Sequence, residues 1–239
     1  MKNIVIVFLF VVSISSCENI LYKDQVPPNG FKTETFKLEA FDRLDINNAF
    51  DVKIIKSNES EVSVKGAEDD IKDLELAVRN GKLEIKYDKR ISLKKIRRYK
   101  MYVEVKTNAI TEVISSSASN TELSGFGLLE KLSIQISGAS KFILNNEIKE
   151  LNSEISGASN LTLNENVSIL DAQVSGASKL HTESSQITSA YLDLSGASKA
   201  EVTVSDKLDI VASGASKVSY KGNPVVTQKL SGSSSVTKE

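Results

Sequence analysis

The chain has 239 residues, a length that suits one or two domains with a substantial core. Its formal net charge at pH 7 is −1, which excludes a strong overall field that would attract nucleic acid or an acidic membrane. The chain contains no Trp and only three Pro, and polar stretches separate segments rich in Val, Ile and Leu, so the composition favours short strands over long helices.

Residues 1–16 are predicted to be a secretory signal peptide. Lys2 supplies the positive charge at its start, and Ile4 to Val12 form an apolar stretch that is too short to cross a membrane. The small residues Ser15 and Ser16 stand at the expected cleavage point. The protein is therefore expected to be exported.

Cys17 is the only cysteine, so it cannot form a disulfide within the chain. The sequence Ile14-Ser15-Ser16-Cys17 resembles the lipobox of bacterial lipoproteins, which implies that the Cys17 thiol is diacylated and becomes the new N-terminus. Two or three acyl chains anchor stably, at about 0.8 kcal/mol per buried CH₂. The alternative is an unmodified cysteine beside an ordinary cleavage site. We expect a lipid anchor in the bacterial cell envelope, in the outer membrane, on its periplasmic or its surface face.

Residues 17–30 are predicted to be the lipidated cysteine and a polar tether, since they include Pro27-Pro28 and Asn29-Gly30. Residues 31–106 are predicted to be a β-rich N-terminal part, because apolar and polar residues alternate along six segments that should each bury one face. The segments are 31–40, 49–55, 61–66, 74–79, 82–87 and 101–107.

Three shorter features lie among these segments. Asn80-Gly81 separates two of them and predicts a hairpin with a type I′ turn. One helical turn is expected in residues 66–74, with acids near its start, where the helix dipole favours them. The basic stretch 89–100 is interpreted as a solvated connection and not as a site for an anionic partner, and no aromatic interleaving indicates nucleic acid.

From about residue 107 to residue 239 the sequence repeats. The motif Ser-Gly-Ala-Ser recurs at 137–140, 156–159, 175–178, 195–198 and 213–216, with looser copies at 116–119 and 231–234. Counted from the first Ser of each copy, the steps are 21, 19, 19, 20, 18 and 18 residues. Alternation continues on both sides: Leu132, Ile134 and Ile136 precede one copy, and Phe142 and Leu144 follow it.

Each repeat is therefore expected to contain a strand, a Ser-Gly-Ala-Ser corner, a second strand and a variable corner, with room for a third short side. The predicted fold class is all-β: a right-handed, β-helix-like parallel β-solenoid with ~19-residue coils and strands stacked about 4.8 Å apart, preceded by the β-rich part with its hairpin. An antiparallel meander is the alternative, and it explains less of the constant spacing.

The repeated motif is better explained as a corner than as a site. Gly adopts the positive φ that a sharp bend needs, Ala is expected to fit where space inside the corner is limited, and Ser should satisfy backbone groups that leave the ladder. A serine nucleophile needs a base, and the single His181 cannot serve five copies, so we interpret His181 as a surface or strand residue.

No catalytic, cofactor-binding or metal-binding residues are predicted, so the protein is not expected to be an enzyme. The chain has one Cys and one His, and it has no calcium-loop pattern, P-loop or dinucleotide fingerprint. Hydrolysis of a polysaccharide would need a pair of carboxylates. Four acids at outward strand positions could supply one, although a solvated strand face explains them equally well: Glu154, Asp171, Asp193 and Asp209.

The residue after each full motif is lysine in four of the five copies. Lysine is a usual guard against edge-to-edge pairing of strands, which is the simpler interpretation of this row. The alternative is a surface-binding row for an anionic glycan or surface. The row consists of Lys141, Lys179, Lys199 and Lys217, with Asn160 between the first two and Asn120 before them.

Residues 44–54 (LDINNAFDVKI), residues 77–87 (AVRNGKLEIKY) and the serial corners resemble the GIN domain, also called DUF2807, of Bacteroidetes-type lipoproteins. The resemblance covers about residues 36–235. It implies a β-helix-like fold in an exported protein and the head of an autotransporter adhesin, and it lends no catalytic residues. Asn47-Asn48 stands where the family more often has Ser-Gly, so that bend is expected to differ.

The sequence thus favours a non-catalytic cell-envelope lipoprotein, with an adhesin-like or structural module that binds a glycan or a surface protein. Nucleic acid is not expected as a partner. Two alternatives stay open: a polysaccharide-acting β-helix enzyme and a self-assembling envelope scaffold. The sequence does not specify the oligomeric state.

Overall fold

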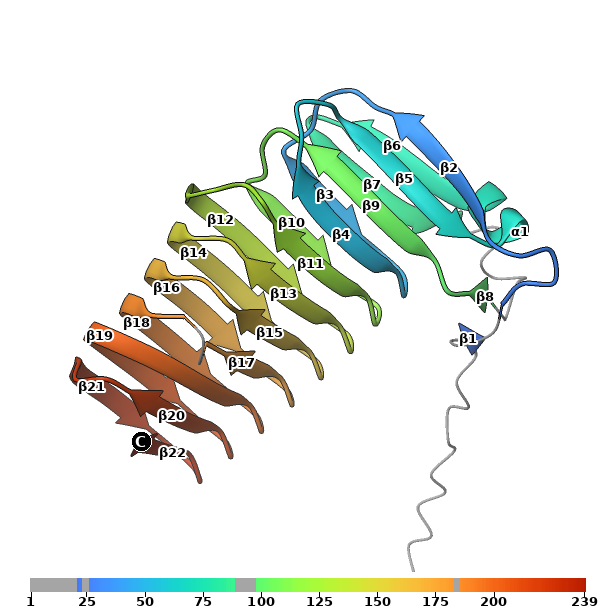
Figure 1. The fold of residues 1–239 in the computed structure, drawn as a ribbon. Coiled ribbons are helices and arrows are strands. Elements are labelled where there is room, and N and C mark those ends of the chain that lie inside the picture. The colour runs from blue at the N-terminus through green and yellow to red at the C-terminus, as the bar shows by residue number, and fades with distance from the viewer. Residues whose placement is uncertain (1–20, 23–25, 89–97, 183–184) are drawn as a thin grey trace, which may run out of the picture.

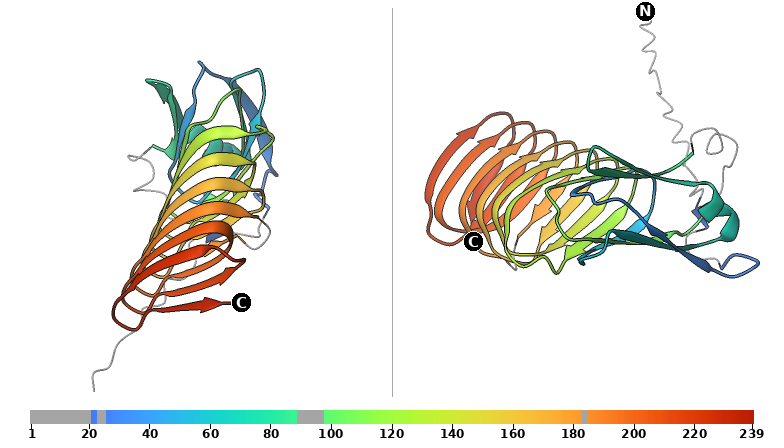
Figure 2. Two further views of the ribbon diagram at one scale, coloured as in Figure 1. Left: turned by 90° about the vertical axis from the view of Figure 1, so that its left-hand side faces the viewer. Right: turned by 90° about the horizontal axis from the view of Figure 1, so that it is seen from above.

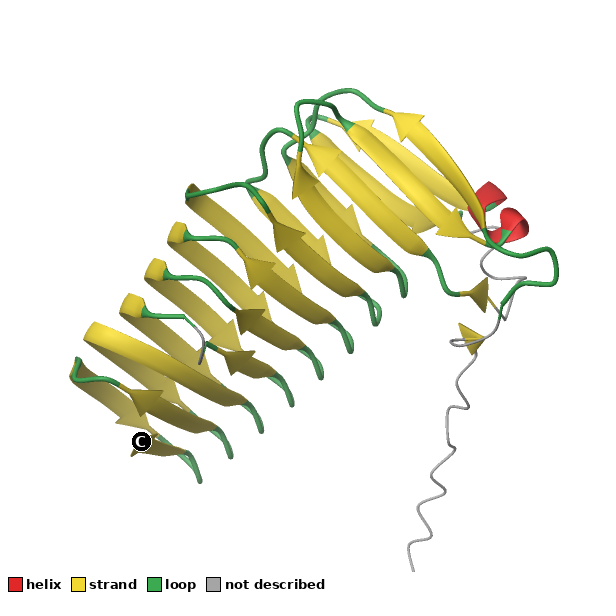
Figure 3. Ribbon diagram, viewed as in Figure 1, coloured by secondary structure: helices red, strands yellow, loops and turns green. Residues whose placement is uncertain are grey.

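The computed structural model describes residues 21–22, 26–88, 98–182 and 185–239. Their regular secondary structure is almost entirely β-strand, drawn in yellow in Figure 3, with one short helix and with loops and turns between the strands. The predicted signal peptide, Cys17, part of the predicted tether and most of the basic stretch 89–100 lie outside the described residues. No helix within the described ranges is long and apolar enough to span a membrane.

The strands form two long sheets that lie across from each other along the molecule, as Figure 1 and the two views of Figure 2 show. Sheet I contains, in spatial order, β2 (Lys32–Lys37), β5 (Glu61–Gly66), β9 (Tyr102–Thr107), β4 (Asp51–Lys56), β11 (Asn120–Ser124), β13 (Lys141–Asn145), β15 (Asn160–Leu163), β17 (Lys179–His181), the first half of β19 (Lys199–Ala212), β20 (Lys217–Lys221) and β22 (Ser235–Lys238). Sheet II contains β6 (Leu74–Arg79), β7 (Lys82–Tyr87), β3 (Arg43–Ile46), β10 (Glu112–Ser115), β12 (Leu129–Ile136), β14 (Ile148–Ile155), β16 (Val167–Val174), β18 (Ile187–Leu194), the second half of β19 and β21 (Val225–Leu230).

Each coil runs from a strand of sheet II through a Ser-Gly-Ala-Ser corner into a strand of sheet I. In one coil β12 leads through residues 137–140 to β13, and the next coil repeats this path with β14 and β15. Equivalent strands pair in parallel and in register, as Ile136 pairs with Ile155 and Lys141 pairs with Asn160. The predicted parallel β-solenoid is confirmed.

The expected third short side corresponds to the first part of the eight-residue strands of sheet II. In β14, Ile148 and Leu151 are both buried although two residues separate them, so the alternation breaks between them. The pairing with β12 breaks at the same place, since Leu129 pairs with Ile148 and the next pair is Lys131 with Glu150. The chain therefore bends inside the strand before it runs straight into the corner.

The parallel stack extends into the N-terminal part. Strand β3 pairs in parallel with β10, and β4 pairs in parallel with β11, so residues 43–56 form a coil of the same stack. Strands β7 and β9 occupy the next rung. Strands β6, β5 and β2 continue the two sheets in the antiparallel sense. The order of the rungs in space thus differs from their order in the sequence, as the blue and green strands of Figure 1 show.

Two local predictions for the N-terminal part are confirmed. Strands β6 and β7 form an antiparallel hairpin with Arg79 opposite Lys82, and Asn80 and Gly81 take the positive φ values of 51° and 73° that a type I′ turn needs. The predicted helical turn is α1 (Glu68–Lys72), with three acids in its first turn. The two-residue strands β1 (Leu21–Tyr22) and β8 (Arg98–Tyr99) pair separately from the two sheets.

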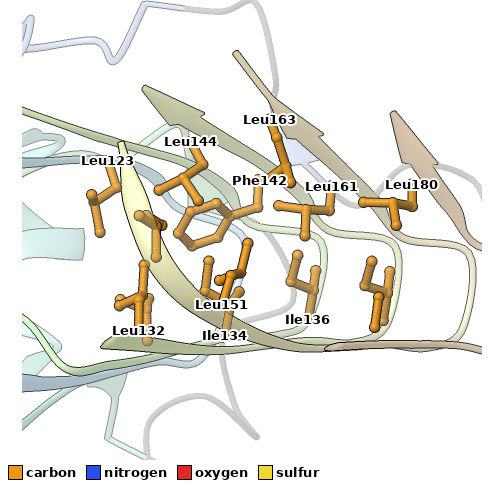
Figure 4. Packing of buried hydrophobic residues seen from close by; sticks show 14 of the residues in the cluster. Leu123, Leu132, Ile134, Ile136, Phe142, Leu144, Leu151, Leu161, Leu163 and Leu180 are labelled. Atoms are coloured by element: carbon orange, nitrogen blue, oxygen red, sulfur yellow. The ribbon is translucent and has the colours of Figure 1, made fainter. Parts of the chain in front are cut away.

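The inward rows of the two sheets form one apolar core (Figure 4). Leu132, Ile134 and Ile136 come from sheet II, Phe142 and Leu144 come from sheet I, and each is at most 1 % exposed. Burial of one such side chain contributes about 1.5–3 kcal/mol. Because every coil repeats the same inward positions, the core continues from coil to coil.

Two of the six segments that were expected to bury one face do not. In β2 only Phe36 is half-buried while its other residues are exposed, and along β6 no residue is fully buried. Both strands lie beyond the parallel rungs and pair with a neighbour on one side only among the described strands. Fewer side chains therefore cover them.

In the Ser-Gly-Ala-Ser corner the role expected of Gly is confirmed and the role expected of Ala is wrong. Gly138 has a φ of 78°, but Ala139 is exposed. The inside of the corner is occupied by Ser140, which is fully buried and donates a 2.8 Å hydrogen bond from its hydroxyl to the carbonyl oxygen of Ser137. The second Ser therefore both fills the corner and satisfies a backbone group that has left the ladder.

Two bends reach positive φ without glycine. Asn48 has a φ of 93°, and its side-chain Oδ1 accepts a 3.0 Å hydrogen bond from the backbone N–H of Tyr87. In the first looser copy of the motif, Ser117 and Ala118 have φ values of 64° and 74°. Asn tolerates this region better than Ser or Ala, because its short amide can bond nearby backbone. The bend at Asn48 thus differs from a glycine bend, as expected.

Candidate functional site

The candidate site is a groove on the outer face of sheet I, toward the N-terminal part of the stack, with a volume of about 590 Å³. Strands β2, β5, β9, β4, β11 and β13 line it, and they are consecutive neighbours in sheet I. Side chains alternate between the faces of a strand, so the outward residues of these strands form its surface. They are Thr33, Asp51, Lys53, Ser63, Lys65, Tyr102, Glu104, Asn120, Glu122, Lys141 and Ile143. We call this feature the sheet I groove.

An aromatic ring is exposed in the sheet I groove. Tyr102 begins β9 and is 40 % exposed, and Phe31 packs edge-on against it at 6.2 Å between ring centroids and 73° between planes. The ammonium of Lys100 lies 5.0 Å from the centre of the Tyr102 ring, and that of Lys65 lies 5.9 Å from the centre of the Phe31 ring. The groove therefore presents an apolar ring face with positive charge beside it.

The Asp51 carboxylate lies next to this ring and is held by two neighbours. Lys100 Nζ lies 2.5 Å from one Asp51 oxygen, and Asn120 Nδ2 donates a 2.8 Å hydrogen bond to the other. The hydrogen bond to Asp51 is the largest cause that raises the pKa of Lys100. Lys100 is therefore cationic at neutral pH, and the charges of Asp51 and Lys100 offset each other.

The other two carboxylates of the groove also have partners. Glu104 lies 3.7 Å from Lys106 Nζ, and Glu122 accepts a 3.0 Å hydrogen bond from Asn145 Nδ2. Lys106 bonds Glu61 as well, and that hydrogen bond is the main reason why the pKa of Lys106 is raised. None of the acids of the sheet I groove is therefore without a hydrogen-bonding or charged neighbour.

Three lysines of the sheet I groove differ from these acids. Lys53, Lys65 and Lys141 are exposed on its surface, and none forms an ion pair with any residue that the structure describes. Asp51 has the cationic partner Lys100 and Glu104 has Lys106, whereas Glu122 bonds a neutral amide, so these three ammonium groups outnumber the groove carboxylates that lack a cationic partner among the described residues. A chain with a net charge of −1 thus gathers three exposed lysines at this place.

The predicted lysine row is one continuous line of outward side chains on sheet I, and it runs into the groove. Register places Asn120, Lys141, Asn160, Lys179, Lys199 and Lys217 on successive rungs. Lys141 belongs to the groove, and Lys179 and Lys217 are exposed along the same face. Lys199 instead forms an ion pair with Glu201 on its own strand.

The reasoning from sequence did not single out Tyr102, Lys53 or Lys65. All three occupy outward positions of segments that were predicted as strands, so their exposure could be read from the alternation. Their proximity could not, because β4 lies between β9 and β11 although β9 follows it by almost fifty residues. The groove therefore forms between strands that are neighbours in sheet I but distant in the sequence.

The four acids considered for hydrolysis lie on the opposite sheet. Glu154 and Asp193 share one outward row of sheet II, and Asp171 and Asp209 share the next, with Tyr191 between the last two. The Lys207 ammonium lies 2.6 Å from Asp209 and lowers its pKa. A general acid needs a raised pKa, so Asp209 has the wrong shift for that role.

A smaller groove of about 290 Å³ on sheet II contains a closer pair of carboxylates, Asp45 and Glu84, which face each other on β3 and β7. Burial is the main cause that raises the pKa of Asp45. Asn47 donates a 2.8 Å hydrogen bond to Asp45, and Lys86 Nζ lies 2.7 Å from Glu84. This is the arrangement on sheet II that comes nearest to an acid–base pair.

His181 lies in β17 and is half-buried, so its interpretation as a strand residue is confirmed. Its Nδ1 lies 2.7 Å from a Glu201 oxygen. Lys199, as the larger cause, and His181 lower the pKa of Glu201. Over the described ranges, no three His, Cys, Asp or Glu side chains come together in a way that would hold a metal ion.

Fold and site together define a two-sheet parallel β-solenoid with a polar, lysine-bearing groove on one face. A family model described as "Putative auto-transporter adhesin, head GIN domain" matches residues 40–224, and the chain belongs to this family. The resemblance seen in the sequence is thereby confirmed.

Solved structures share this fold. A "putative adhesin" from Parabacteroides merdae aligns with a TM-score of 0.72 over 92% of this chain and 99% of its own, and one from Bacteroides fragilis with 0.74 over 90% and 98%. A "putative lipid binding protein" from Parabacteroides distasonis aligns with 0.73 over 92% and 99%. Each is 15% identical, so these likenesses show the fold alone. No curated protein matches the chain.

Proposed function

We propose that the protein is a non-catalytic lipoprotein of the cell envelope whose solenoid binds a surface ligand in the manner of an adhesin head. The observation that carries this proposal is the sheet I groove, which is lined by the exposed Tyr102 ring and by three lysines that form no ion pair with any described residue. Membership of an adhesin-like family supports it. Side chains mounted on paired strands are preorganised, which lowers the entropy lost on binding.

The ligand-binding test uses the chain from residue 17 onward with Cys17→Ser, which cannot be acylated. We expect this protein to bind to intact cells or to a set of spots on a glycan array, and Tyr102→Ala to lower that signal. Tyr191→Ala is the matched control, because Tyr191 is 41 % exposed on sheet II while Tyr102 is 40 % exposed on sheet I. A flat array together with no cell adhesion would contradict the binding function.

The anchor is tested separately. Mass spectrometry of the N-terminal peptide from the membrane fraction should find acyl chains on Cys17, and Cys17→Ser should move the protein to the soluble fraction. An unmodified Cys17 in the membrane fraction would contradict the anchor. Protease treatment of intact cells then distinguishes the two faces of the outer membrane, and the adhesin-like role requires that the protein be digested.

The enzyme alternative is tested on the same preparation. We expect no release of reducing ends or unsaturated ends from acidic or neutral polysaccharides. Release that Asp45→Asn abolishes would replace the binding proposal, because Asp45 has the raised pKa that a general acid needs and faces Glu84. A mass that rises with concentration in light scattering would favour the scaffold alternative.

A further inference from the structure

We propose that the sheet I groove takes an acidic glycan, a polysaccharide that carries carboxylate or sulfate groups. This inference rests on the proposed binding function and names its ligand class. It depends on three features of the described residues: which charges of the groove are paired, where the aromatic ring lies, and how the lysine row continues from the groove.

The pairing of charges favours an anionic ligand. The carboxylates of Asp51, Glu104 and Glu122 each have a partner at 2.5–3.7 Å. The ammonium groups of Lys53 and Lys65 have no such partner among the described residues, and the same holds for Lys141. An anion can therefore bind the lysines without first breaking an ion pair, whereas a cation would have to displace Lys100 to reach Asp51 and Lys106 to reach Glu104.

The aromatic ring favours a sugar over a simple anion. The C–H face of a pyranose ring is apolar and can pack against the exposed face of Tyr102. Two rungs from Tyr102, Asn120 uses its amide N–H to bond Asp51, and its carbonyl oxygen, which accepts no hydrogen bond from any described residue, can accept one from a sugar hydroxyl. Lys65 and Lys100 lie beside the aromatic pair. The aromatic ring, the amide oxygen that accepts from a hydroxyl, and the nearby ammonium groups together suit a sugar that bears an acidic group.

The lysine row can bind further acidic groups of a long polysaccharide that extends from the groove along the solenoid. Lys141, Lys179 and Lys217 occupy alternate rungs of sheet I, about 9–10 Å apart. The intermediate Lys199 is paired with Glu201, so the exposed cations form an evenly spaced series that starts in the groove. An extended polyanion that leaves the groove along sheet I would meet these ammonium groups in turn.

An anionic membrane is the competing partner, and the groove suits it less well. Among the residues that the structure describes, Tyr102 is the one strongly exposed large apolar side chain that lines the groove. Insertion into lipid needs a larger apolar surface. The groove is also concave and contains three carboxylates between its lysines, which a flat anionic surface would have to approach.

The test measures affinity by calorimetry on the mature chain with Cys17→Ser. The probes are hexagalacturonate, a heparin hexasaccharide, neutral cellohexaose and phosphatidylglycerol vesicles. We expect at least one acidic oligosaccharide to bind about tenfold or more tightly than cellohexaose, by the sum of several exposed charge contacts. Its affinity should fall several-fold between 50 and 200 mM salt, since the Debye length is about 10 Å at 0.1 M.

Variants locate the binding. Lys53→Gln combined with Lys65→Gln should weaken the acidic oligosaccharide about tenfold. Lys131→Gln combined with Lys207→Gln removes the same charge from sheet II and should change the affinity less than twofold. Lys179→Gln combined with Lys217→Gln should weaken long polygalacturonate more than the hexamer. An unchanged affinity for the polymer would remove the lysine row from the proposal.

The failure of this inference can be told apart from that of the binding function. Equal affinity for cellohexaose and the acidic probes, lost in Tyr102→Ala, would overturn the acidic ligand and leave binding at the groove intact. Binding to vesicles without binding to any oligosaccharide would overturn it in favour of lipid. Binding to acidic probes that the Lys53 and Lys65 changes leave unaltered would overturn the assignment to the groove.

Discussion

Gly157 lies directly against the carbonyl oxygen of Gly138 in the preceding coil: a methyl carbon added to Gly157 would be 2.3 Å from that oxygen. The same oxygen accepts a 2.8 Å hydrogen bond from the N–H of Ala158. The corner therefore needs Gly for two separate reasons, its φ of 78° and the close approach of the neighbouring coil. Gly176 repeats the relationship, with the added carbon 2.4 Å from the Gly157 oxygen.

Gly157→Ala should therefore destabilise the protein more than an ordinary glycine substitution. Gly127→Ala is the control, because Gly127 has a φ of 69° but nothing within 4 Å of an added carbon. The control should lose about 1–2 kcal/mol from its left-handed backbone alone. Gly157→Ala should lose at least ~2 kcal/mol more, because the neighbouring coil must also shift. Urea unfolding measures both, and equal midpoints would contradict the steric account.

At the first corner, the looser motif copy at residues 116–119, a substitution to glycine is expected to stabilise the protein. Ser117 holds a φ of 64° where the later copies have Gly, so Ser117→Gly should stabilise the protein by up to about 1 kcal/mol. Ala139 lies one residue after Gly138 and does not have a positive φ, so Ala139→Gly should cost about 0.5–1 kcal/mol. Thermal unfolding of the two variants checks this pair. The strain assigned to the first corner would be wrong if both variants shifted in the same direction.

The ionisation of Glu201 makes the stability of the folded protein depend on pH. Lys199, and then His181, hold its pKa below the ordinary value of 4.5, so Glu201 contributes stability that is present above pH 4.5 and lost as the pH falls through its folded pKa. Because the group is partly exposed, the contribution is about 0.5 kcal/mol. Denaturant unfolding at pH 7 should show Glu201→Gln less stable than the wild type, and the difference should shrink as the pH falls from 4.5 through the lowered pKa of Glu201.

Lys199→Gln tests the cause of that shift. The loss of stability that Glu201→Gln causes at neutral pH is measured in two backgrounds, Lys199→Gln and His181→Asn. It should be smaller in the Lys199→Gln background, since Lys199 lowers the pKa of Glu201 more than His181 does. A loss that keeps its full size without Lys199 would show that another group lowers the pKa of Glu201.

Much of the fold follows from local patterns in the sequence. The register of Ile136 with Ile155 and of Lys141 with Asn160 follows from a motif that recurs after nineteen residues, because parallel coils of equal length stack like residues on like. The Asn80-Gly81 turn follows from two positive φ values that few other residue pairs adopt. The role of Ala139 did not follow, because a small residue fits both the inside and the outside of a tight bend.

The site depends on contacts that no local pattern encodes. The repeat predicts the lysine row, and one member of that row, Lys141, lines the groove. Tyr102 could not be assigned to the groove from the sequence, because its neighbours Asp51 and Lys65 lie on β4 and β5. Both strands are distant from β9 in the sequence, and β5 runs antiparallel to it. The alternation shows that Tyr102 faces outward but not which side chains share its surface.

The groove as the binding surface is tested most directly by mapping a ligand onto the folded chain. Backbone amide NMR shifts would be recorded while the mature chain with Cys17→Ser is titrated with the best-binding array ligand. We expect the largest shifts at Asp51, Tyr102 and Asn120, which line the sheet I groove, and small shifts around Tyr191 on sheet II. Largest shifts on sheet II, or shifts spread evenly over both sheets, would contradict the account.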